Sequence, residues 1–159
     1  MQTDLLIRFG TALAIGFLIG LQREFSYLNT NRPIFAGERT FSLLALSGAL
    51  AAMASDEFNQ PLIFLGVILF VGLLAGSAYT IEAWRGRRVG ITSEVAVLIA
   101  ILIGALCYWG FLTLATALGI LTTVILSIKV ETDRFVRTLT REDVITALQF
   151  AVISVIVLP

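Results

Sequence analysis

The chain has 159 residues, of which 58% are hydrophobic and 14% charged. A soluble domain of this length could not bury so much apolar surface, so the composition excludes ordinary soluble proteins and predicts a protein built almost entirely within a lipid bilayer. The 11 basic and 11 acidic residues balance, which gives no indication of a nucleic-acid partner. Because histidine is absent and there is one cysteine, imidazole catalysis and an intrachain disulfide are excluded. We expect no enzyme and no catalytic residue.

Five apolar runs, each about as long as a membrane-spanning helix, follow one another with short polar breaks. They are Leu5–Leu21, Thr40–Ala54, Pro61–Ile81, Thr92–Trp109 and Phe111–Val130. The first run continues past a small-residue site at 12–14, so we interpret it as a retained span rather than a signal peptide. The expected fold is an all-α, polytopic transmembrane bundle of five spans.

A sixth apolar run, Val144–Leu158, follows Thr140-Arg141-Glu142-Asp143, which has the form of a helix start. It predicts a further C-terminal helix, partial or complete. The expected organisation is a transmembrane domain at 1–130, a cytoplasmic amphipathic linker at 131–143 and the start of another transmembrane helix at 144–159. Since the last run is short and reaches the chain end, we expect a fragment of a longer protein.

The basic residues are distributed unevenly between the two sides of the predicted bundle. All except Arg8 lie at the end of, or in the breaks after, the first, third and fifth runs: Arg23, Arg32, Arg39, Arg85, Arg87, Arg88, Lys129, Arg134, Arg137 and Arg141. Short loops rich in Lys and Arg remain in the cytoplasm. The expected orientation is therefore N-terminus outside and basic loops cytoplasmic.

Glycines four residues apart let helices approach closely in lipid, and they recur in the two halves of the chain. The predicted packing residues are Gly16, Gly20, Gly72, Gly76 and Gly104. The first pair precedes a basic loop, a helix start at 37–40 and a Gly-Ala-Leu triplet at 48–50, and the second pair precedes a similar series at 90–93 and 104–106. This order predicts two parallel helical hairpins, and the glycine seams suit packing within the chain or in a homodimer.

Charged residues at the rim of a bilayer are costly and usually pair, snorkel or line a polar cavity. The candidates at the predicted cytoplasmic ends are Arg23, Glu24, Glu38, Arg39, Glu82 and Glu94. On one interpretation Arg23 and Glu24 snorkel, while Glu38 and Glu94 lie in the first turns of helices, where the positive end of the helix dipole favours an acidic side chain. On the other, Glu24, Glu38 and Glu94 line a shared polar cavity and hold a hard cation such as Mg²⁺. The supporting polar residues would be Arg23, Arg39, Thr40, Thr92 and Ser93.

Residues 16–24 (GFLIGLQRE) and 36–40 (AGERT) resemble the MgtC/SapB family of bacterial inner-membrane proteins. The helix start at 90–93 (GITS) is similar to that family's glycine-hydrophobic-threonine-threonine segment, and 72–76 (GLLAG) is similar to its third span. The resemblance covers about residues 5–125. It implies a bacterial plasma-membrane protein linked to magnesium homeostasis, in which Mg²⁺ is the expected ion and no other cofactor is known.

The same resemblance leaves two functions open. Some members are annotated magnesium transporters, and others act by contacting another membrane complex, including the ATP synthase. Glu38 and Glu94 stand where better-known members have uncharged residues, and the family's Asp-Pro-x-Arg is reduced to Asp56 with a separated Pro61. The family's soluble C-terminal domain is replaced by the segment at 140–143 entering another helix, as in a subgroup with a second membrane domain. We expect either cation transport through a cytoplasm-facing site or a non-transporting module that dimerises or regulates a membrane partner.

Overall fold

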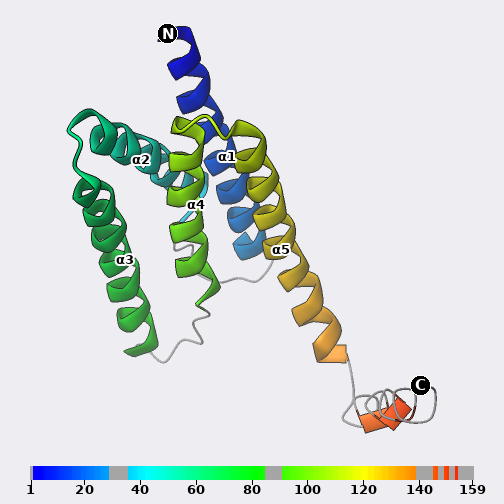
Figure 1. Ribbon diagram of the computed structural model, residues 1–159. Helices are drawn as coiled ribbons and strands as arrows, with labels where there is room; N and C mark the ends of the chain where they lie inside the picture. The colour runs from blue at the N-terminus through cyan, green and yellow to red at the C-terminus, as the bar shows by residue number, and fades with distance from the viewer. Residues whose placement is uncertain are drawn as a thin grey trace. The chain divides into compact units, whose positions relative to one another are not determined.

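The computed structural model has the expected all-α class. It describes residues 2–28, 36–84, 91–138, 145–146, 149–150 and 153. Within these residues there are five helices and no strand: α1 (Gln2–Leu28), α2 (Glu38–Glu57), α3 (Pro61–Trp84), α4 (Thr92–Tyr108) and α5 (Leu112–Thr138). Figure 1 shows α3 at one edge, beside α2 and α4.

Two described helices are long and apolar enough to cross a membrane, over Thr3–Ser26 in α1 and Pro61–Ile81 in α3. Shorter apolar helical segments follow at Thr92–Tyr108 and Leu112–Ile128. Leu62, Leu69 and Leu73 of α3 are more than half exposed, which suits an environment of lipid rather than water. The structure thus supports a membrane protein and leaves the number of spans as a prediction.

Helix boundaries differ from the predicted ones chiefly in α1 and α5. Helix α5 continues to Thr138, so its last turns occupy residues that the sequence assigns to a linker after 130. Of the predicted sixth helix, only Ile145, Thr146, Gln149, Phe150 and Ile153 are described, all of them helical. The chain divides into two compact units, residues 1–126 and 127–159.

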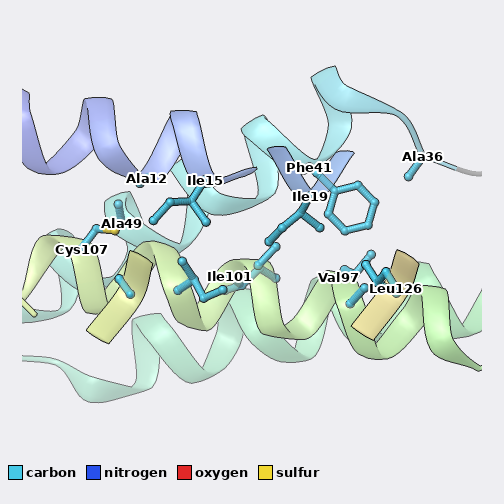
Figure 2. Packing of buried hydrophobic residues seen from close by; sticks show 14 of the residues in the cluster. Ala12, Ile15, Ile19, Ala36, Phe41, Ala49, Val97, Ile101, Cys107 and Leu126 are labelled. Carbon is cyan, nitrogen blue, oxygen red and sulfur yellow. The ribbon is translucent and has the colours of Figure 1, made fainter. Parts of the chain in front are cut away.

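The core of the first unit lies where α1, α2 and α4 meet, and α1 packs against both of the other helices. Figure 2 shows Ile15 and Ile19 of α1 directed toward Ile101 of α4, with Phe41 of α2 beside Ile19. All four side chains are at most 5% exposed. Branched and aromatic side chains fill this space, while the closest helix contacts are formed by glycines.

Helices α2 and α4 cross in contact at two glycines. A Cβ built on Gly48 would lie 2.7 Å from the carbonyl carbon of Ile101, and a Cβ built on Gly104 would lie 2.7 Å from that of Ala45. The two contacts are equivalent to each other. The sequence shift that takes Gly48 to Gly104 also takes Ala45 to Ile101, so each helix places its glycine against the corresponding residue of the other helix. Reciprocal contacts of this kind are expected where two equivalent helices cross, and they agree with the predicted internal repeat. By the same sequence shift, Glu38 of α2 is the repeat equivalent of Glu94 of α4.

The two hairpins differ in how closely their helices pack. On α1, a Cβ built on Gly16 would lie 2.8 Å from the Cα of Ser42, whereas on α3 the nearest atom to the equivalent position, Gly72, is Leu98 Cδ2 at 3.9 Å. Leu98 is the repeat equivalent of Ser42, and its larger side chain holds α3 away from α4. Nothing among the described residues lies within 4 Å of a Cβ at Gly76, so this glycine makes no close helix contact with the described part of the chain.

Candidate functional site at the polar end of the bundle

The end of the bundle at which α1 finishes and α2 and α4 begin is called here the polar end. Gly20 brings α1 against the start of α2, since a Cβ built on it would lie 2.8 Å from the carbonyl oxygen of Gly37. The residues that immediately follow on α1 are Gln22, Arg23 and Glu24. The close packing that sequence analysis assigned to Gly20 therefore delivers three polar side chains to the first turns of the neighbouring helices.

Arg23 connects α1 to the beginning of α4. Its guanidinium donates through Nη2 to the hydroxyl oxygen of Ser93, and the two residues are only 8% and 9% exposed. A buried guanidinium is costly unless its hydrogen bonds are satisfied, so this contact fixes the position of the arginine. One interpretation of the sequence proposed that Arg23 snorkels to the surface. In the structure its side chain is buried instead.

Glu24 connects α1 to the beginning of α2. The carboxylate accepts a hydrogen bond from the backbone N–H of Glu38, the first residue of α2, and the two glutamate side chains also hydrogen-bond to each other. Two carboxyl groups can do so only by sharing a proton. The hydrogen bond with Glu24 lowers the pKa of Glu38, and Arg39, whose Nε lies 3.6 Å from Glu38 Oε1, lowers it further.

The third predicted carboxylate, Glu94, lies in the first turn of α4. Its Oε2 is buried and has no hydrogen-bond partner among the described residues, and the same is true of Gln22 Oε1 on α1. Among the described residues no group of three or more His, Cys, Asp and Glu side chains is arranged to hold a metal ion. The structure thus joins Glu24 to Glu38, and leaves Glu94 as a separate buried oxygen on the neighbouring helix.

The supporting residues predicted from the sequence are distributed unevenly around this pair. Ser93 is engaged by Arg23, Thr92 is partly buried beside it, and Thr40 is exposed. Arg39 is exposed and touches the pair only through Glu38. The side chain of Glu82 lies outside the described residues. Gln22 was not singled out from the sequence, although its place in the 16–24 segment, next to Arg23, was a usable signal.

A second polar cluster, which sequence reasoning missed, lies at the opposite end. Arg8 of α1 donates to the backbone carbonyl oxygen of Tyr108 at 2.6 Å, and its guanidinium is 2.8 Å from the carboxylate of Asp4. Trp109 Nε1 donates to Asp56 Oδ2 at 3.2 Å. Arg8 thereby satisfies a carbonyl at the negative end of α4, as Glu24 satisfies an amide at the positive end of α2. One helix, α1, therefore caps both of its neighbours.

The arrangement defines the class of protein. The outward faces of the helices are apolar, and the two polar clusters described above lie at the ends of the bundle. This is the pattern of a helical membrane protein. Over residues 9–135 the chain matches the MgtC family, and it belongs to that family. The resemblance drawn from residues 16–24 and 36–40 is thereby confirmed. Comparison with curated proteins and with solved structures gave no match.

Proposed function

We propose that this protein takes part in magnesium or other divalent-cation homeostasis in the bacterial inner membrane, through a cation site at the polar end. The observation that carries the proposal is the Glu24–Glu38 carboxyl pair, assembled from two helices whose backbones are in contact. Paired carboxylates are repulsive unless a proton or a cation lies between them, and hard cations take carboxylate oxygens and retain several waters.

Two further features support a cation at this position. The buried Oε2 of Glu94 and Oε1 of Gln22 are oxygen acceptors with no partner among the described residues, and each lies on a helix that contributes to the polar end. Buried acceptors of this kind favour an ion or an ordered water in the same region. Arg23, bonded to Ser93, offsets part of the negative charge and would tune the affinity.

Magnesium binding by the purified protein in lipid nanodiscs, measured by titration calorimetry, tests this proposal. Wild type should bind Mg²⁺, and Glu24→Gln and Glu38→Gln should each weaken binding by about tenfold or more, since even the loss of a residue that only orients a metal ligand has an effect of that size. Glu57→Gln is the matched control, because Glu57 is an exposed carboxylate at the other end of α2. Equal affinity in all four proteins would refute a site at the polar end.

Transport is the finer part of the proposal, and flux is its test. Proteoliposomes loaded with a magnesium-sensitive dye should show Mg²⁺ entry that Glu24→Gln and Glu94→Gln reduce. The proposed orientation places the N-terminus outside and the polar end in the cytoplasm. A cysteine introduced at Glu57 in a Cys107→Ala background should then react with an impermeant maleimide on intact cells, and one at Arg39 should react only after lysis.

The second candidate function is a non-transporting module that dimerises or docks on another membrane protein. The observation in its favour is the exposed face of α3, where Gly66 and Gly76 have no neighbour within 4 Å among the described residues. Gly16 and Gly20 already pack against α2, so the proposed docking face is that of α3. Crosslinking in native membranes should give a dimer or a partner adduct that Gly76→Leu abolishes. A monomer in both proteins, together with Mg²⁺ flux, would exclude this function.

A further inference from the structure

Gly37 occupies the N-cap position of α2, immediately before the carboxyl pair. Its backbone angles are φ −101° and ψ −164°, in the extended region that every L-residue adopts. The backbone conformation therefore does not require glycine here. A helix N-cap favours Ser, Thr, Asp or Asn, whose side chains bond to the first amides of the helix; glycine is also favoured there, but Gly37 supplies no such bond.

The space around Gly37 is taken by the functional carboxylate. A Cβ built on Gly37 would lie 2.8 Å from Glu24 Oε2, and among the described residues the only other atom within 4 Å is Cδ of the same carboxyl, at 3.6 Å. Real Cβ atoms essentially never approach a heavy atom so closely. The absence of a side chain at 37 thus gives Glu24 its place against the first amide of α2.

We infer that Gly37 is a positioning residue, which sets the Glu24 carboxylate against Glu38 and the start of α2. The role follows from what would have to move. The atom that a Cβ meets is the free end of a flexible side chain, so a substitution displaces the carboxylate and leaves both helix backbones in place. At Gly20 the colliding atoms are backbone atoms, the oxygen of Gly37 and the nitrogen of Glu38 at 2.8 and 2.9 Å, so a substitution there separates the helices.

The consequence is a separation of binding from stability. Gly37→Ala should displace Glu24 and preserve the fold. Gly37→Ser should go further, because serine is a strong N-cap that supplies its own oxygen to α2 in place of Glu24. Stability and cation binding should then change in opposite directions, which a merely structural role for Gly37 would not produce.

The test uses the full chain in lipid nanodiscs and, since the inference rests on the proposed cation site, it has two readouts. The first is the dissociation constant for Mg²⁺, which Gly37→Ala and Gly37→Ser should raise by about tenfold or more, the usual effect of losing a residue that orients a ligand. The unfolding midpoint should fall only slightly in Gly37→Ala, because alanine is a poorer N-cap than glycine, and should stay unchanged or rise in Gly37→Ser. Gly76→Ala, whose added Cβ has no described residue within 4 Å, should leave the dissociation constant unchanged and the unfolding midpoint unchanged or slightly higher.

The second readout is independent of any metal. Infrared difference spectra of the metal-free protein report the carboxyl band of the Glu24–Glu38 pair, identified by its loss in Glu24→Gln. Gly37→Ala should shift that band in wild type and change nothing in a Glu24→Gln background. If wild type binds no Mg²⁺, the cation site fails and the band still decides the role of Gly37. An unshifted band, or a loss of stability in Gly37→Ala equal to that in Gly20→Ala, would overturn the inference.

Discussion

Adding a single methyl group at the crossing of α2 and α4 should destabilise the whole first unit. The Cβ of Gly104→Ala would lie 2.7 Å from the carbonyl carbon of Ala45 and 3.1 Å from its Cα, where carbon atoms normally approach to about 3.5–4.0 Å. All of these are backbone atoms within helices, so no side chain can rotate away. The helices must therefore separate by about 1 Å.

The size of the effect follows from that separation. A gap of about 0.5–1 Å forfeits a quarter to a half of the attraction of each contact, and overpacked sites lose about 1–3 kcal/mol. Because Ala45 and Ile101 are fully buried at this crossing, we expect Gly104→Ala to lose about 2–3 kcal/mol. The relaxed crossing would also accommodate Gly48→Ala, so the double variant should lose less than the sum of the two single ones.

The free energy of unfolding can be measured by titration with SDS in mixed micelles, followed by circular dichroism. Gly66→Ala on α3 is the matched control, because nothing among the described residues lies within 4 Å of its added Cβ. Its helix propensity should make it as stable as wild type or about 0.5–1 kcal/mol more stable. If Gly104→Ala proves as stable as Gly66→Ala, the contact between the two helices is not as close as described and the reasoning fails.

Three further substitutions test the contacts made by α1 and α4. Ser93→Ala removes one acceptor of the buried Arg23 and should lose about 1–3 kcal/mol in the same titration. Ser77→Ala, which removes a bond to the local backbone, should lose less than about 0.5 kcal/mol. Arg8→Met should lose about 0.3–1 kcal/mol, the value of a cation at a helix C-terminus, and high salt should shrink the difference from wild type. Leu98→Ser should let α3 approach α4, seen as a shorter spin-label distance between the two helices; an unchanged distance would disprove the role assigned to its bulk.

The internal repeat shows how well helix packing can be predicted from glycines that recur along the sequence. Gly16, Gly20, Gly48 and Gly104 all lie at close helix contacts, as glycines in lipid-embedded helices usually do. Gly76 also follows a glycine four residues earlier, as Gly20 does, but no described residue lies within 4 Å of a Cβ built on it. The difference depends on the facing helix: the start of α2 lies against Gly20, and one step along each hairpin Gly16 faces Ser42 whereas Gly72 faces the larger Leu98. The difference in packing between these glycines therefore could not be predicted from the sequences of α1 and α3 alone.

The sequence alone determined the all-α class, the membrane character and the family, because these depend on composition, on the length of apolar runs and on local motifs. It also indicated that the ionisable residues gather at one end, since charges avoid the bilayer centre. Only the tertiary structure decided which charges meet: Glu24 with Glu38, Arg23 with Ser93, and Glu94 with neither carboxylate. Those pairings depend on how closely the helices approach and on their relative rotation, and both are determined by contacts between residues far apart in the chain.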